Sequence, residues 1–219
     1  MLGAGTSDDT SAIAALAALG GSILIDGTVT LKPDTTAEIT LISNTKFWGL
    51  GKGKSIIRIS ESSNPASDTF GFRLLNLSNI SFEHLTIDSD AAAQGIFNLG
   101  TLSGGVYGPD QAGNLYGMRI SQCDDVRFNH VAIEGFNAQG VLFTNEDGTS
   151  TYNTNVKLTH SDSRNNRITG FSLQACNGFE VFGGVHENNG LQVFDSVDSE
   201  GNPTSTTRTA TNFIDGGTG

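Results

Sequence analysis

Lysine and arginine are scarce in this chain. Its 219 residues include 12 Lys and Arg against 23 Asp and Glu, which gives a formal net charge of −11. A surface of that sign repels a phosphate backbone, so nucleic acid is excluded as a partner. An acidic polysaccharide would need a local basic patch or a bridging divalent cation such as calcium, and the sequence otherwise indicates no cofactor.

Long apolar runs and short functional motifs are also missing. No run approaches the roughly 18 apolar residues of a membrane span. Met1 is followed by Leu-Gly-Ala-Gly rather than by a basic and then an apolar signal region. The sequence has no nucleophile elbow, phosphate-binding loop or zinc-ligand spacing. We therefore expect no membrane span, no resident metal and no export through an ordinary signal peptide.

Glycine, by contrast, is abundant and marks an internal repeat. Residues 71–88 can be laid over residues 117–134 without a gap, and each segment opens with Gly followed by an apolar residue. The same opening recurs about every 20 to 30 residues, at Gly95, Gly140, Gly170 and Gly190. A repeat of this length is typical of a solenoid.

Each repeat predicts two short strands around one turn, because apolar and polar residues alternate on both sides of Asn79 and Asp125. Stacking the repeats places like side chains in vertical columns, such as Phe82 beside Phe128. Each buried side chain contributes about 1.5–3 kcal/mol, and coils share this burial only with their neighbours. We predict an all-β fold over residues 22–219, a single-stranded right-handed parallel β-helix (solenoid) of about eight or nine coils.

Residues 1–21 predict a cap on this solenoid. The stretch Ser7-Asp8-Asp9-Thr10 offers an N-cap and acidic first-turn residues, and it precedes an Ala-rich apolar segment that ends at Gly20. The pattern predicts a short α-helix over about residues 8–19. Such a helix would lie over the open end of the core and hide a strand edge.

The segments GTSDDTSAIAAL (residues 5–16) and GGSILIDGTVTL (residues 20–31) resemble the opening of the pectate-lyase-like superfamily of right-handed parallel β-helices. The repeat extends this resemblance over nearly the whole chain. The superfamily includes polysaccharide lyases, mannuronan epimerases and bacteriophage tailspikes, so the resemblance implies a polysaccharide as ligand. Epimerase activity is not implied, because the Gly-Phe-Asp-Pro-His-Glu stretch of those enzymes is replaced here by Gly-Val-Leu-Phe-Thr-Asn-Glu at residues 140–146.

The two cysteines, Cys123 and Cys176, each stand six residues after the opening Gly of a repeat and share one column. With one coil between them they would lie about 9.6 Å apart, which is too far for a disulfide. We expect both to be small core residues, which is consistent with a reducing origin.

Three repeats carry extra residues, near 100–115, 145–154 and 195–211. We expect all three insertions to leave the solenoid at the same corner as polar loops. Such loops either build a wall beside a binding groove or mark a corner that tolerates insertion.

One outward column contains the strongest catalytic candidates. It is expected to carry Asp88, Glu134, Arg164 and Glu187, with one coil missing between the first two. Two coils would separate Glu134 from Glu187 by about 9.6 Å, close to the roughly 6.5–9.5 Å between acid and base in an inverting glycosidase. The alternative is a surface charge ladder of small energetic value. Asp162 joins Arg164 as a candidate, because residues 160–164 resemble the place where lyases set an acid near a proton-abstracting base.

A second column holds His84, His130 and His160, with about 5 Å expected between histidines on adjacent coils. A metal ion between His130 and His160 would need a third ligand, and none is obvious, so stacked turn histidines are the alternative. Arg127 and Lys157 form a small basic strip beside them. His130, His160, Arg127 and Lys157 are candidates for substrate binding, and the basic strip would either meet an acidic sugar or remain solvated.

Three functions remain open. The first is a tailspike-like virion appendage of a phage tail, a homotrimer that recognises a host surface polysaccharide and, if an enzyme, acts as a depolymerase. The second is an extracellular stand-alone polysaccharide lyase or glycoside hydrolase. The third is a purely structural spacer or adhesin. The first is favoured because the sequence shows no signal peptide, no closing cap after the last repeat and no match to the known lyase and epimerase residues.

Overall fold

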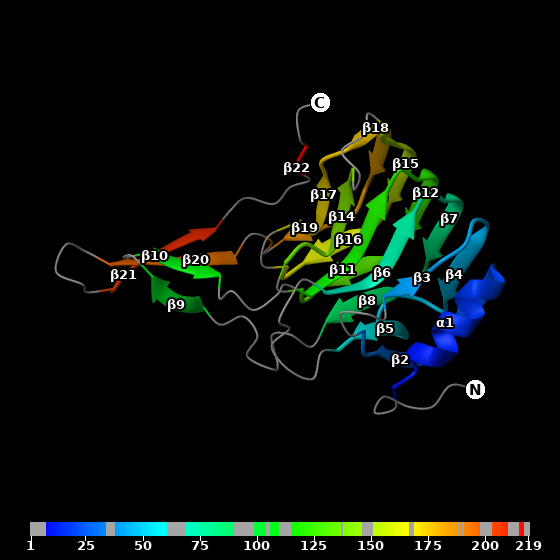
Figure 1. Ribbon diagram of the computed structural model, residues 1–219, viewed down its shortest axis with the longest axis horizontal. Helices are drawn as coiled ribbons and strands as arrows, with labels where there is room; N and C mark the ends of the chain where they lie inside the picture. The colour runs from blue at the N-terminus through cyan, green and yellow to red at the C-terminus, as the bar shows by residue number, and fades with distance from the viewer. Residues whose placement is uncertain are drawn as a thin grey trace.

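The computed structural model describes one α-helix and twenty-two strands. The described residues are 8–33, 38–60, 69–89, 99–103, 106–109, 115–136, 138–145, 151–166, 169–187, 189, 191–197, 203–209 and 215–216. Eighteen of the strands form three six-stranded sheets, in which every pairing is parallel. These sheets are called A, B and C below (Figure 1).

The three sheets have the following strands. Sheet A consists of β1 (Gly21–Ile25), β4 (Thr45–Gly49), β7 (Ser78–Glu83), β12 (Asp124–Asn129), β15 (Asn153–Thr159) and β18 (Cys176–Phe182). Sheet B consists of β2 (Gly27–Leu31), β5 (Ser55–Ile59), β8 (Thr86–Ser89), β13 (Ala132–Glu134), β16 (Asp162–Arg164) and β19 (His186–Glu187). Sheet C consists of β3 (Ile39–Thr40), β6 (Thr69–Leu75), β11 (Leu115–Ser121), β14 (Val141–Thr144), β17 (Phe171–Leu173) and β22 (Asp215–Gly216).

The chain visits sheets A, B and C in turn, and each passage through the three sheets is one coil. The described strands make six such coils, which is consistent with a parallel β-helix. The expected number of eight or nine coils is wrong. The strands that follow two of the glycine openings, β9 (Leu99–Ser103) after Gly95 and β20 (Leu191–Val197) after Gly190, do not belong to these three sheets, and β17 pairs with β22 rather than with β20.

The register expected from the gapless repeat is confirmed. Phe72 pairs with Met118, Phe82 with Phe128 and Asp88 with Glu134, so the two repeats are direct neighbours in all three sheets. The turn residues Asn79 and Asp125 have φ angles of 58° and 55°. Asn and Asp tolerate this left-handed conformation better than most residues, which explains their place in the repeat.

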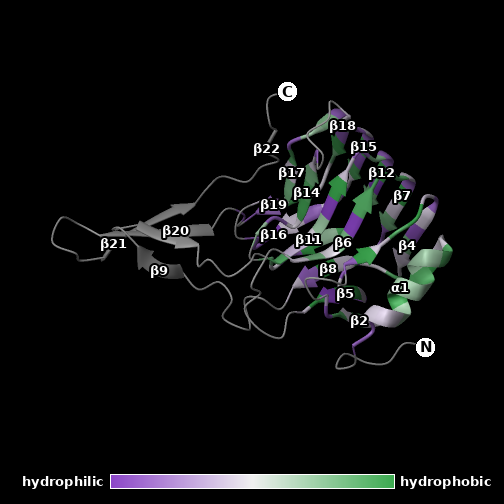
Figure 2. Cartoon of the chain, in the orientation of Figure 1, coloured by the Kyte–Doolittle hydropathy of each residue, from purple (hydrophilic) through white to green (hydrophobic). Residues whose placement is uncertain are grey.

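Phenylalanine rings fill the space between the sheets. Phe47, Phe82 and Phe128 form one continuous stack, with ring centroids 5.4 and 5.3 Å apart, and all three are fully buried. Phe72 meets this stack edge-on from sheet C. Hydrophobic and hydrophilic residues alternate along the strands (Figure 2), so one face of each sheet lines the core and the other faces outward.

Helix α1 (Thr10–Leu19) lies beside β1 and β3 at the first coil. Ile13 and Ala17 are fully buried, so the helix covers one end of the core. Asp9, at the N-cap, does not cap the helix through its side chain; its Oδ2 instead accepts the Thr30 N–H at 3.0 Å. No helix in the described part of the chain is long and apolar enough to cross a bilayer.

The cysteines are free, with Cys123 buried and Cys176 partly exposed. Asn153 lies between them in the column, paired in register with Cys176 and accepting the Cys123 N–H through Oδ1 at 3.0 Å. Burial raises the pKa of the Cys123 thiol to about 11 and that of the Cys176 thiol to about 12. Both side chains therefore behave as inert core residues.

The remaining four strands form a separate antiparallel sheet, called sheet D. It consists of β9 (Leu99–Ser103), β10 (Val106–Pro109), β20 (Leu191–Val197) and β21 (Pro203–Thr209), in the order β21-β20-β10-β9. Its two hairpins come from different coils and join where Val106 pairs with Ser196. In Figure 1 sheet D projects away from the three parallel sheets.

Sheet D changes the interpretation of the insertions. Two of the three segments expected to be polar loops, near 100–115 and 195–211, contain strands of sheet D. Both leave the coil between a strand of sheet B and a strand of sheet C, whereas the segment near 145–154 connects β14 of sheet C to β15 of sheet A. The prediction of one shared corner is therefore wrong. Of the 145–154 segment, residues 146–150 lie outside the described residues.

Candidate functional site

A column of charged residues runs along the outer face of sheet B. In register it reads Arg58, Asp88, Glu134, Arg164 and Glu187, one from each of five consecutive strands. The expected gap of one coil between Asp88 and Glu134 is wrong, because these two residues pair directly. Glu187 stands opposite Arg164, as the predicted column requires.

Most charges in this column are paired. Arg58 donates to Asp88 through Nε at 3.0 Å and through a terminal nitrogen at 2.7 Å, a bidentate geometry. Arg164 forms ion pairs with Glu187 at 2.9 Å and with Asp162 at 3.6 Å. Among the described residues, the side-chain carboxyl group of Glu134 has no hydrogen-bond or ion-pair partner.

Glu134 is therefore the unusual carboxyl group of the column. It is half-buried, and burial raises its pKa; the neighbouring Asp88 carboxylate raises it further, while Arg164 partly offsets both effects. A carboxyl group that holds its proton more tightly than usual is suited to donate that proton to a leaving group.

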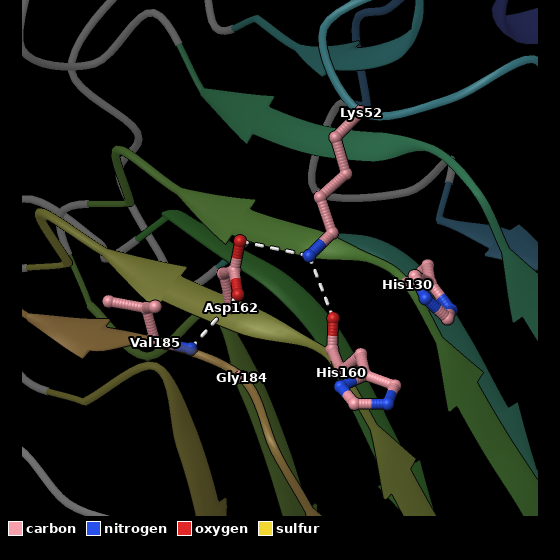
Figure 3. Close-up of a pocket in the computed structure, with 6 residues that line it drawn as sticks. All are labelled: Lys52, His130, His160, Asp162, Gly184 and Val185. Carbon is pink, nitrogen blue, oxygen red and sulfur yellow. Dashed lines mark hydrogen bonds and ion pairs between the residues drawn. The ribbon is translucent and has the colours of Figure 1, made fainter.

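A shallow pocket of about 350 Å³ opens beside this column (Figure 3). Its lining residues are Lys52, His130, His160, Asp162, Gly184 and Val185. The Lys52 ammonium donates to Asp162 Oδ2 at 2.9 Å and to the His160 carbonyl at 2.7 Å. Lys52 comes from the turn after β4, so the pocket joins segments more than 100 residues apart in sequence.

Asp162 is an ionised anchor in this pocket. Burial raises its pKa, but the hydrogen bonds from Lys52 and from the Val185 N–H outweigh that effect, so the pKa lies below its usual range. Both carboxylate oxygens already accept a hydrogen bond. Asp162 is therefore better placed to orient a ligand hydroxyl or hold Lys52 than to accept a proton.

The three histidines form a stack at the turn between sheets A and B. Ring centroids are 5.0 Å apart for His84 and His130 and again for His130 and His160. Their φ angles are 54°, 53° and 46°, so all three occupy left-handed turn positions. Burial lowers the pKa of His130, and the adjacent rings of His84 and His160 lower it further, so the middle ring is neutral at pH 7. Within the described residues, no three His, Cys, Asp or Glu side chains are arranged to hold a metal ion.

The basic strip of Arg127 and Lys157 lies away from the pocket. Arg127 and Lys157 lie on the outer face of sheet A and do not line the pocket. Arg127 donates to both carboxylate oxygens of Asp125, at 2.6 and 2.7 Å, and Lys157 forms an ion pair with Glu180 at 3.2 Å. With its charges matched by these acids, the strip offers little attraction to an acidic sugar.

Sequence reasoning missed Lys52 and Val185. Lys52 stands in the segment Gly51-Lys52-Gly53-Lys54, in a turn whose Gly51 N–H donates to the His84 carbonyl at 2.8 Å. Extending the histidine column back by one coil would therefore have pointed to this turn. No sequence signal pointed to Val185, which lies in the connection between β18 and β19.

No protein-family model matches this chain, and neither a curated protein nor a solved structure shows significant similarity to it. Function is therefore inferred from the geometry of sheet B and its pocket. Three features there bear on chemistry: a half-buried carboxyl with a raised pKa, a second carboxylate two coils away and a pocket with polar and apolar walls.

Proposed function

We propose that this chain is a right-handed parallel β-helix that binds and hydrolyses a surface polysaccharide along the outer face of sheet B. The right hand is inferred from the rule that crossovers between parallel strands of one sheet are right-handed in about 98% of cases. The resemblance of residues 5–31 to the pectate-lyase-like superfamily supports a tailspike-like virion appendage of a phage tail, assembled as a homotrimer.

The proposal rests on the half-buried Glu134, whose raised pKa suits a general acid. Glu187 lies two strands further along the same column, about 9.6 Å away at the usual strand spacing. This is near the upper end of the roughly 6.5–9.5 Å that leaves room for a water molecule in inverting glycosidases. Arg164 lies between the two carboxyl groups and pairs with Glu187, so it orients that carboxylate.

The proposed reaction is hydrolysis with inversion. Glu134 donates its proton to the glycosidic oxygen as the bond from that oxygen to the anomeric carbon breaks. Glu187 accepts a proton from a water molecule, and the water oxygen bonds to the anomeric carbon from the opposite face. The products are two shorter glycans, one with a new reducing end, and the step needs no cofactor.

The pocket beside the column would hold a neighbouring sugar unit. The Asp162 carboxylate and the His130 ring can hydrogen-bond hydroxyl groups, and Val185 offers an apolar surface for the C–H face of a sugar. Lys52, Arg58 and Arg164 are each paired with an Asp or Glu, so this face has little uncompensated positive charge. The pairing supports an uncharged polysaccharide as the substrate class.

The proposal is tested first by glycan-array binding and then by release of reducing ends from each bound polysaccharide. Glu134→Gln should keep binding and lose turnover by about 10²-fold or more, as expected when a general acid is removed. Glu180→Gln is the matched control, because Glu180 is an exposed acid on sheet A and should leave both readouts unchanged. Turnover that survives Glu134→Gln would refute the assigned acid.

The other functions correspond to other outcomes. A trimer that binds a glycan without cleaving it would support the recognition role and refute the proposed hydrolysis. A monomer with turnover would indicate a stand-alone enzyme, and an unsaturated product would identify it as a lyase. No binding to any glycan would refute the proposal and leave a structural spacer or adhesin.

A further inference from the structure

The sixth coil exposes side chains that the other coils bury. Phe179 and Val181 on β18 stand in the inward columns, in register with Val156 and Leu158 on β15. Val156 and Leu158 are fully buried, whereas Phe179 and Val181 are 47% and 41% exposed. A side chain in an inward column becomes exposed in this way when no coil stacks on its far side.

The backbone of β18 is open on the same side. In the described part of the chain, β18 pairs with β15 only, and β19 pairs with β16 only. A strand edge with apolar inward positions is a template for the addition of another strand. In the adjacent sheet B, the buried Nε2 of His186 has no hydrogen-bond partner among the described residues, which is a second unmet interaction in this coil.

The charges along the exposed edge of β18 determine which residues a docking strand would carry. The outer column of sheet A ends with Lys157 paired to Glu180, and that of sheet B ends with Arg164 paired to Glu187. Glu180 has a side chain that is 73% exposed, so its carboxylate remains accessible. A strand stacked on β18 would place its middle residue beside Glu180, where a Lys or Arg is favoured and an acid is disfavoured.

A second copy of this chain fits this surface poorly. Its first coil is covered by α1, whose Ile13 and Ala17 are fully buried, so stacking of that coil on β18 is blocked. Two copies meeting end to end through β18 would bring Glu180 of each copy to the same interface. The net charge of −11 adds to that repulsion.

We propose that β18 is a docking edge for a β-strand of another polypeptide, which adds in parallel and carries an apolar-basic-apolar triplet opposite Phe179, Glu180 and Val181. The strand β15 shows that this chemistry fits, because its Val156, Lys157 and Leu158 occupy the same positions on the other edge of β18. The inference is independent of the hydrolysis proposed for sheet B.

The test uses the full-length protein and two fluorescently labelled peptides. The first has the sequence of residues 153–160, Asn-Thr-Asn-Val-Lys-Leu-Thr-His, and the second replaces its Lys with Glu. Fluorescence anisotropy should show that the Lys peptide binds about threefold to tenfold more tightly than the Glu peptide, as expected for one cross-strand charge pair against one like-charge pair. Absence of binding by both peptides overturns the proposal.

Variants locate the binding edge. Glu180→Lys should invert the preference between the two peptides, and Phe179→Lys should abolish binding of both. Glu83→Lys is the matched control, since Glu83 also pairs with a lysine, Lys46, on sheet A but far from β18, and it should change nothing. Circular dichroism confirms folding of each variant. An unchanged preference in Glu180→Lys, or a wild-type dimer that Phe179→Lys dissociates, overturns the proposal.

Discussion

Replacement of Phe82 by alanine tests the stacked core most directly. Phe82 is fully buried at the centre of the phenylalanine stack, with ring centroids 5.4 Å from Phe47, 5.3 Å from Phe128 and 5.8 Å from Phe72. A buried Phe→Ala change costs about 3–5 kcal/mol. Aromatic pairs add about 0.5–1.5 kcal/mol each beyond area burial, and Phe82 loses two stacked pairs. We therefore expect a loss near the upper end, about 5 kcal/mol.

Two comparisons separate volume from ring stacking. Phe82→Leu keeps most of the apolar volume and should cost about 1–3 kcal/mol. Phe182→Ala removes a ring that is 68% exposed and should cost about 1 kcal/mol or less. The order Phe82→Ala, Phe82→Leu, Phe182→Ala is therefore expected for the loss of unfolding free energy.

Urea unfolding followed by the fluorescence of Trp48 measures these losses. Trp48 is the only tryptophan in the sequence, and it follows Phe47 on the strand next to Phe82. A loss of about 5 kcal/mol should lower the urea midpoint by roughly 2 M for an m value near 2.5 kcal/mol/M. A loss below about 1 kcal/mol for Phe82→Ala, or equal losses for Phe82→Ala and Phe182→Ala, would refute the stacked arrangement.

Three further predictions concern other buried groups. The pKa of Glu134 is higher in the folded protein than in the unfolded chain, so wild type loses unfolding free energy as pH rises from the unfolded pKa through the folded pKa. Glu134→Gln should therefore match wild type below this pH window and be more stable than wild type as pH rises through it. A difference in unfolding free energy that does not change with pH contradicts this prediction. Asn153→Ala removes the hydrogen bonds that Asn153 makes with the Cys123 N–H and with three backbone carbonyls. Chemical denaturation should show that the unfolding free energy falls by about 2–4 kcal/mol. A fall of less than about 0.5 kcal/mol would show that these hydrogen bonds do not stabilise the fold. Cys123 and Cys176 should react slowly with a thiol reagent at pH 8 and quickly in urea, and rapid reaction of the folded protein would contradict their raised pKa values.

The stacked pairing could be predicted from the sequence because its signal is repeated. Phe82 and Phe128, or Asp88 and Glu134, are 46 residues apart in sequence, and each pair stands in register as the gapless repeat requires. Register in a sheet with one buried face is strongly specified, since a slip of one residue would turn every apolar side chain outward. A repeat of apolar positions therefore fixes which strands are neighbours.

The number of coils could not be predicted in the same way. The alternation of apolar and polar residues after Gly190 identifies a strand, and β20 is one. Alternation has the same period in parallel and antiparallel strands, so it does not say which strand is the partner. The partners of β20 are β21, the other strand of its own hairpin, and β10, and not β17.

The charged column of sheet B was predicted from the sequence, but Lys52, Val185 and the pairing of the side chains were not. Glu134, Arg164 and Glu187 occupy the expected column, because that column follows from register alone. The pairing of Lys52 with Asp162 depends on how a turn folds over the neighbouring strands, and sequence periodicity carries no information on that. The same limit applies to Arg127 and Asp125, which are two residues apart on one strand.

The contact between β10 and β20 has a mechanical consequence. The segments that contain these strands leave sheet B after β8 and after β19, which are three strands apart in that sheet. Their pairing acts as a buckle across the last four coils, so the sixth coil cannot detach from its neighbours while β10 and β20 remain paired. Amide hydrogens of β12 and β15 should then exchange together as one cooperative unit, while those of β1 and β2, which lie outside the buckle, exchange independently and faster.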